Sequence, residues 1–274
     1  MTRPATGETD EMGGAGPDPW TFWVPVVAVF VVAAMATLAQ HASMEAMGGE
    51  PMPGGWMTST VWGRPCGRGA GRAFAAFAGM WGAMTVTMML PALAPVLWRY
   101  RQRVASSAGA HPVWRVIVAG VGYFAVWMAF GALAFPIGGA LAVAAVRLPA
   151  LGRAMPFAAG AVVAGAGMLQ FSAWKVRRLA CCRHTGAGVH ATKVDARPAW
   201  RHGVRVAVHC SACCGNLMAI SLAAGVMDLH VMAAVTAAIA AERLAPGGER
   251  VARIVGGVAI GGGLVMIARA AGLL

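Results

Sequence analysis

The sequence from Trp20 to Ala42 reads WTFWVPVVAVFVVAAMATLAQHA and contains no Asp, Glu, Lys or Arg. An α-helix needs about 20 mainly apolar residues to cross the hydrocarbon core of a bilayer, so this stretch predicts a membrane-spanning helix. The whole chain has the same character, because 58% of its 274 residues are hydrophobic and only 12% are charged. A soluble domain carries roughly 25% charged residues. Most of the surface is therefore expected to face lipid.

Further apolar stretches of this kind follow along the chain. They predict an all-α fold, a polytopic transmembrane helical bundle of about seven spans that occupies residues 20–274, after a disordered N-terminal tail at 1–19. The segment 136–150 is also apolar, but prolines and an arginine interrupt it, which indicates a re-entrant or interfacial segment. The seven expected spans are residues 20–42, 73–98, 113–135, 154–174, 204–224, 226–243 and 252–271.

The distribution of Lys and Arg predicts the orientation. With the N-terminus inside, sixteen of the 22 Lys and Arg fall on inner segments and six on outer ones. Cytoplasmic segments of membrane proteins carry such an excess. The bias places 43–72 as an external Met-rich loop and 175–203 as a basic cytoplasmic loop. Nothing in the sequence resembles a nucleic-acid-binding surface.

The densest group of potential metal ligands lies in the fifth expected span. It reads HCSACC from residue 209 to residue 214, and Met218 follows one turn later. Residues three and four apart lie close on one side of a helix, which would bring His209, Cys210, Cys213 and Cys214 together. Thiolate and thioether ligands suit Cu(I), and thiolate with imidazole also suits zinc. The alternative is packing, because Cys also serves as a small buried apolar residue.

A methionine stripe lies in the second expected span. Met80, Met84 and Met88 recur every four residues, with Met89 beside them, so they share one side of a helix. Such a stripe is often packing. However, Met88 and Cys213 are both expected roughly 12–15 Å from the inner ends of their helices, at a rise of about 1.5 Å per residue. The two clusters would therefore meet at a similar depth if their helices are neighbours.

Two further groups of soft ligands are expected in the loops. The external loop is rich in Gly and Pro, so there is little core for its methionines to fill. These methionines are expected either to capture metal or to anchor the loop at the membrane interface. The cytoplasmic group consists of adjacent cysteines and a histidine, which fits soft-metal binding, thiol exchange, or an ordinary reduced pair at a helix end. The external residues are His41, Met44, Met47, Met52 and Met57, and the cytoplasmic ones are Cys181, Cys182 and His184.

These segments resemble the DUF2182 family, whose members are described as predicted metal-binding integral membrane proteins of bacteria. The signature helix is matched by residues 80–91, MWGAMTVTMMLP, with Pro95 beyond. A second block is matched by His202-Gly203, Cys210, Cys213-Cys214 and Leu217-Met218. Weaker matches are Tyr123 to Gly131, Gly167 to Lys175 with Cys181, Gly225 to Met227, and Glu242 to Gly248. The chain departs from the family at Ala212, where Gly is common, and at Gly215-Asn216, where Trp is common. The resemblance implies metal binding but no particular reaction. It also implies a location in a bacterial cytoplasmic (inner) membrane, which the protein would cross several times.

The function that these clusters predict is binding of a soft metal, above all Cu(I) with zinc as a second possibility, in copper transfer or transport. A metallochaperone or a larger membrane complex would be its partner, beside the lipid bilayer. The protein is expected to be a metal-binding or transport protein rather than an enzyme. Two alternatives stay open: a membrane thiol–disulfide oxidoreductase that uses Cys210 and Cys213, and a structural or assembly subunit of a membrane complex.

Overall fold

The fold is seen in a computed structural model, which describes residues 18–47, 50–51, 57–58, 69–105, 112–184, 196–225 and 228–273. Helices make up nearly all of the described chain, and one short antiparallel pair of strands precedes the second helix. The elements are α1 (Trp20–Met47), β1 (Glu50–Pro51), β2 (Met57–Thr58), α2 (Ala70–Ala105), α3 (Pro112–Arg147), α4 (Pro149–Leu169), α5 (Ala173–His184), α6 (Ala196–Ala224), α7 (Leu229–Leu244) and α8 (Gly248–Ala270).

The predicted helical membrane bundle is confirmed. Within the described chain, six helices are long and apolar enough to cross a membrane: α1, α2, α3, α4, α6 and α8. The sixth expected span, residues 226–243, corresponds to α7, which has only 16 residues. At about 1.5 Å per residue this helix is roughly 24 Å long, shorter than a hydrocarbon core of about 30 Å. The side chain of Asp228 caps its first turn, which sets its start, and Pro246 follows soon after its end.

Helices extend into three segments where the sequence did not predict them. The segment 136–150 is not a separate re-entrant element, because α3 continues through Pro136 to Arg147 and α4 begins at Pro149. The segment 43–72 contains the end of α1 and the start of α2, and 175–203 contains most of α5 and the start of α6. The expected disordered tail at 1–19 lies almost wholly outside the described residues.

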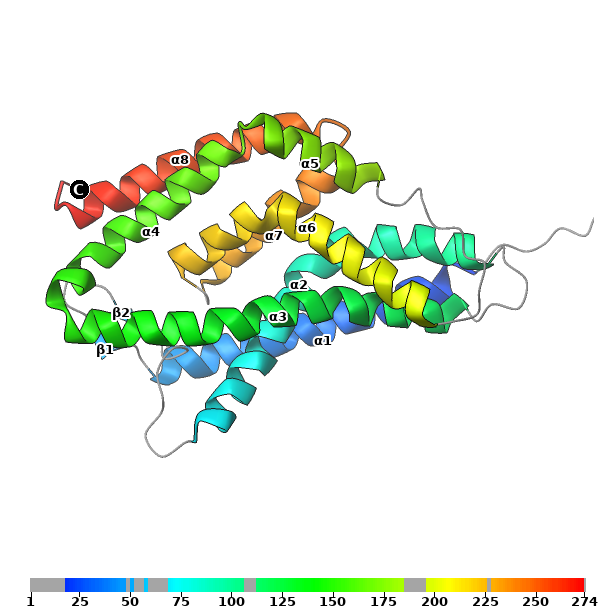
Figure 1. Ribbon diagram of the computed structural model, residues 1–274, viewed down its shortest axis with the longest axis horizontal. Helices are drawn as coiled ribbons and strands as arrows, with labels where there is room; N and C mark the ends of the chain where they lie inside the picture. The colour runs from blue at the N-terminus through cyan, green and yellow to red at the C-terminus, as the bar shows by residue number, and fades with distance from the viewer. Residues whose placement is uncertain are drawn as a thin grey trace, which may run out of the picture.

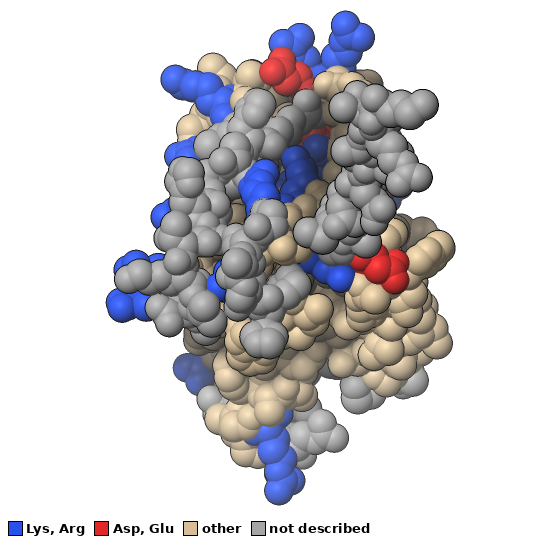
Figure 2. Space-filling view, turned by 90° about the vertical axis from the view of Figure 1, so that its right-hand side faces the viewer, with Lys and Arg blue, Asp and Glu red and all other residues tan. Residues whose placement is uncertain are grey.

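The chain passes back and forth between the two ends of the bundle, and α7 returns between α6 and α8 (Figure 1). As a result, α1 begins at one end and α8 finishes at the other. Figure 2 looks onto the end where α1 begins and shows many more Lys and Arg than Asp and Glu side chains. This agrees with the predicted clustering of basic residues at one end, while the side of the membrane on which that end lies stays a prediction.

Helices α2 and α6 form the centre of the bundle. In their most apolar stretches, 50% of the residues of α2 and 44% of those of α6 are buried, against 28% or less in the other four long helices. Helix α2 is fixed to α3 because the indole Nε1 of Trp81 donates a hydrogen bond of 2.8 Å to the carbonyl of Trp127. It meets α6 where the rings of Tyr100 and His202 stack with centroids 4.5 Å apart.

Glycines allow two pairs of helices to pack backbone against backbone. A Cβ on Gly263 of α8 would lie 2.6 Å from the carbonyl oxygen of Gly160 on α4, and one on Gly256 would lie 2.9 Å from that of Gly167. A Cβ added at Gly257, Gly261 or Gly262 of the same helix would meet no atom within 4 Å. Small residues are used in this way at helix contacts in lipid.

Gly203 makes the corresponding close contact between α6 and α3, and it yields a stability prediction. A methyl group at this position would collide with the carbonyl of Ala119, which is backbone and cannot rotate away. We expect Gly203→Ala to lower the free energy of unfolding by about 1–3 kcal/mol, as overpacking does. Thermal unfolding in detergent micelles, followed by circular dichroism, measures the change.

Gly215→Ala is the matched control, because Gly215 lies in the same helix and no atom lies within 4 Å of an added Cβ. This variant should unfold close to the wild-type temperature. Equal losses in the two variants would show that the contact with α3 is not what requires Gly203.

Candidate metal site

The centre of the candidate site is a pair of buried thiols on α6. Cys210 and Cys214 are 0% and 1% exposed, and their Sγ atoms lie 3.5 Å apart. Four residues correspond to a little more than one helical turn, so the two side chains lie on the same side of α6. The Sγ of Cys214 also donates to the carbonyl oxygen of Cys210 at 3.0 Å. Neither residue is in a disulfide.

Two other helices direct hydrogen-bond donors at the Cys210 sulfur. The hydroxyl of Tyr123 on α3 donates to it at 3.0 Å, and a guanidinium nitrogen of Arg243, near the end of α7, donates at 3.1 Å. Tyr123 is completely buried, so its ring and hydroxyl are fixed by packing. A positive group and two N–H or O–H donors around one sulfur suit a thiolate, the form in which cysteine binds metal.

Cys213 lies on another side of α6. It is buried against Leu179 of α5, in a cluster separate from the large core that contains Cys210 and Cys214. The difference from the sequence prediction has a simple cause, because consecutive residues of a helix point about 100° apart. Among the described residues, no three His, Cys, Asp or Glu side chains come together in an arrangement that could hold a metal ion. His209 is half-buried on α6.

Beside the segment of α6 that carries the cysteines, a buried ion pair joins α5 to α7. The ammonium of Lys175 lies 2.7 Å from a carboxylate oxygen of Glu242, and both side chains are 1% exposed. Lys175 also donates to the carbonyl oxygen of Cys213 at 2.7 Å, and Gln170 donates to the other oxygen of Glu242 at 2.7 Å. Because charges inside a membrane bundle are expensive, such a network indicates a functional region. It holds the segment of α6 that carries the cysteines.

The methionine stripe of α2 belongs to the same buried core as the thiol pair. Met80, Met84, Met88 and Met89 are between 0% and 6% exposed, and Met218 of α6 is buried with them. The sequence predicted that Met88 and Cys213 lie at a similar depth; the methionines share one core with Cys210 and Cys214, whereas Cys213 is buried in a separate cluster. That these methionines bind metal stays a prediction.

The two loop groups are described only in part. His41 is half-buried in α1, whereas Met52 lies outside the described residues. The backbones of Met44 and Met47 belong to the last turns of α1, and that of Met57 to β2. Cys181, Cys182 and His184 lie in the last two turns of α5. The roles predicted for these two groups in metal capture or release stay predictions.

Four polar residues of the site were not identified from the sequence: Tyr123, Lys175, Glu242 and Arg243. None of them belongs to a cluster of soft ligands, so a search for metal-binding residue types does not select them. A signal was nevertheless present. All four fall within the segments that carry the weaker family resemblance, Tyr123 to Gly131, Gly167 to Lys175 and Glu242 to Gly248.

The fold and the site together define a polytopic membrane protein with a buried, cation-supported pair of thiols. A family model described as "PpoB2: Copper chaperone" matches residues 78–266, more than half of the chain, and the chain belongs to that family. The matched segment runs from α2 into α8 and includes every residue of the thiol site. The comparison thus supports a copper-related membrane family, under a different name from DUF2182. No curated protein and no solved structure shows significant similarity to the chain.

The Lys175–Glu242 pair yields a second stability prediction. Lys175→Met would leave the buried carboxylate of Glu242 without the ammonium at 2.7 Å. Loss of one partner of a buried ion pair costs about 3–5 kcal/mol, so we expect a large drop in the thermal stability of the protein in detergent. The double variant Lys175→Met/Glu242→Gln removes both charges and should recover part of the loss.

Arg177→Met serves as the control, because Arg177 is exposed on the same helix. It should change the unfolding temperature little, since exposed charges contribute little to stability. If the double variant were less stable than Lys175→Met alone, the charge of Glu242 would not be the source of the loss.

Proposed function

We propose that the protein is a membrane copper chaperone that binds Cu(I) between Cys210 and Cys214 and passes it to a partner. The observation that carries this proposal is the pair of buried Sγ atoms 3.5 Å apart, within the segment matched by the copper chaperone family. Thiolates are soft ligands that select Cu(I). Two such ligands on adjacent turns of one helix supply a low-coordinate site without a third residue.

The charges around the pair favour Cu(I) over zinc. Cu(I) with two thiolates carries one net negative charge, and Arg243 supplies one positive charge at 3.1 Å from the Cys210 sulfur. This balance matters because an uncompensated charge in a membrane interior is costly. Zinc sites in proteins use three or four protein ligands. Among the described residues, no three His, Cys, Asp or Glu side chains come together in that way.

The methionines of α2 would then provide weaker soft ligands beside the thiols. Thioethers bind Cu(I) without carrying charge, so Met80, Met84, Met88 and Met89 suit the passage of the ion through a buried core. The receiver would be a metallochaperone or a larger complex in the bacterial cytoplasmic membrane, with the basic end of the bundle on the cytoplasmic side. Release from a two-thiolate site requires only exchange of sulfur ligands.

The geometry gives less support to a thiol–disulfide oxidoreductase that uses Cys210 and Cys213. A dithiol of that type must bring its two sulfurs together, whereas these residues are buried in separate clusters. A purely structural subunit would not need a guanidinium and a phenol hydroxyl directed at one cysteine sulfur. Copper binding therefore accounts for more of the arrangement.

The proposal predicts that the three cysteines of α6 differ in their effect on copper binding. Cys210→Ser and Cys214→Ser should each weaken Cu(I) binding by more than about 100-fold, since removal of even an indirect contact costs 10–100-fold. Cys213→Ser, the matched control, should bind as the wild type does. Anaerobic titration of the purified protein against a coloured Cu(I) chelator measures these affinities. Equal loss in all three variants, or none in any, would contradict the proposed site.

Tyr123→Phe provides a separate test of the hydrogen bond to Cys210. It removes the hydroxyl at 3.0 Å from the sulfur and keeps the buried ring. We expect Cu(I) affinity to fall by about tenfold, the lower end of the effect of residues that orient metal ligands. The same titration measures it. An unchanged affinity would show that the hydroxyl serves packing or folding and not the bound metal.

A further inference from the structure

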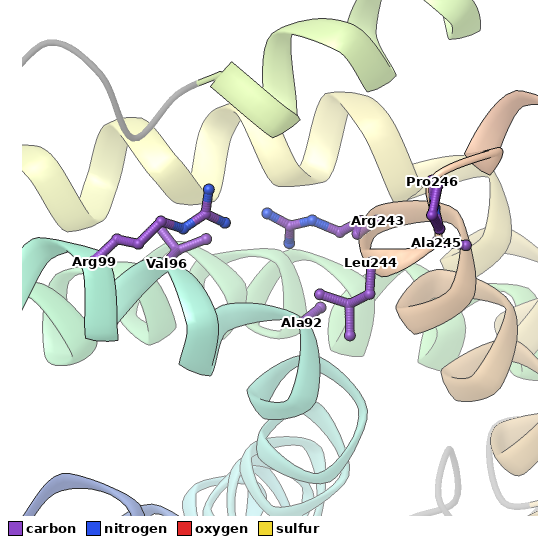
Figure 3. A pocket seen from close by; sticks show the side chains of 7 residues that line it. All are labelled: Ala92, Val96, Arg99, Arg243, Leu244, Ala245 and Pro246. Carbon is purple, nitrogen blue, oxygen red and sulfur yellow. The ribbon is translucent and has the colours of Figure 1, made fainter. Parts of the chain in front are cut away.

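A cavity of about 290 Å³ lies beside the thiol site, between the second half of α2 and the end of α7. Two arginines project into it, and their guanidinium groups face each other from opposite walls (Figure 3). Arg99 comes from α2 and Arg243 from α7. The rest of the lining is mainly apolar and consists of Ala92, Val96, Leu244, Ala245 and Pro246.

The positive charge of this cavity favours an anion as its ligand. Both ionisable residues that line it are arginines, and none of the described lining residues is acidic. Guanidinium groups bind carboxylates through paired hydrogen bonds, which gives direction as well as charge. A volume of about 290 Å³ lies at the lower end of the range for small-molecule sites, which excludes a folded partner as the occupant.

Arg243 connects the cavity to the thiol pair. It lines the cavity and also donates to the Cys210 sulfur at 3.1 Å. Exposure falls along this path, because Arg99 is exposed, Arg243 is half-buried and Cys210 is fully buried. The path starts in the half of α2 that leads to the basic end of the bundle (Figures 1 and 2). An anion held between the arginines would therefore be separated from the Cys210 sulfur only by the side chain of Arg243.

We propose that this cavity binds the small anionic carrier from which Cys210 receives copper, a carboxylate-bearing thiol in complex with Cu(I). This inference rests on the function proposed above. The carboxylate pairs with Arg99 and Arg243, which draws Arg243 toward the cavity and opens access to the Cys210 sulfur. The transfer is an exchange of ligands at Cu(I): the bond to the carrier sulfur breaks and a bond to the Cys210 sulfur forms. Copper remains Cu(I), and the carrier leaves as a thiolate, which takes the proton that the Cys214 thiol releases when it becomes the second ligand.

The experiment compares two copper donors with opposite charge. Purified full-length protein in detergent at low salt is loaded either from the anionic Cu(I) complex of glutathione or from the cationic Cu(I) complex of acetonitrile. Arg99→Gln is the test variant, because Arg99 is exposed and does not contact the sulfur pair. Loading from the glutathione complex should slow by about tenfold, as expected when one charge-assisted contact is lost. Loading from the acetonitrile complex should not slow.

The control is Arg253→Gln, which removes the same charge from an exposed position on α8 outside the cavity. It should load from both donors at the wild-type rate. The difference between the two donors should also shrink as salt is raised, because salt screens exposed charges. Equal slowing with both donors, equal slowing in Arg253→Gln, or no slowing in Arg99→Gln would overturn the proposal.

The same measurements separate this inference from the function on which it rests. Wild-type protein that loads from the acetonitrile complex but not from the glutathione complex would refute the carrier site alone. Wild-type protein that loads from neither donor would refute the proposed copper function, and the carrier site with it.

Discussion

The buried ion pair between Lys175 and Glu242 is the interaction that the site depends on most directly. It joins α5 to α7, and through the Cys213 carbonyl it also fixes α6 between them. Since Glu242 and Arg243 are consecutive, a carboxylate held in place by Lys175 and Gln170 also fixes the stretch of α7 from which the guanidinium projects. Burying two charges in a membrane bundle costs free energy. The position of this pair next to the thiols gives a reason why the charges are found there.

Much of the fold could be predicted from the sequence, because lipid imposes a strict rule on composition. Long apolar runs identified the six helices of the described chain that can span a membrane. The exceptions occur where local effects compete with hydropathy. Asp228 shortens α7 by capping its first turn. Pro136 looked like an interruption, yet a proline inside a membrane bundle is tolerated where neighbouring helices restrain the chain, so α3 continues through it.

The candidate site was predictable only where its residues share a helix. The spacing of Cys210 and Cys214 was sufficient to bring their sulfurs together. It did not show that Cys213 is buried against α5, because its direction differs by about 100° from that of Cys214 and depends on where α5 packs. Tyr123 and Arg243 come from two other helices, and a single polar residue carries no pattern from which its partner can be found. Their placement depends on tertiary packing, which one sequence does not encode in any local signal.

The two prolines within α2 have a mechanical consequence. Pro91 and Pro95 each remove one backbone hydrogen bond from this helix, and α2 bends sharply along its length (Figure 1). The bend divides the helix into one arm with the methionine stripe and another with Ala92, Val96 and Arg99. The two missing hydrogen bonds lie one turn apart, so the helix alone does not hold the bend rigidly. The angle of the second arm therefore depends on side-chain packing, such as the stacking of Tyr100 on His202, and that packing sets the direction in which Arg99 projects.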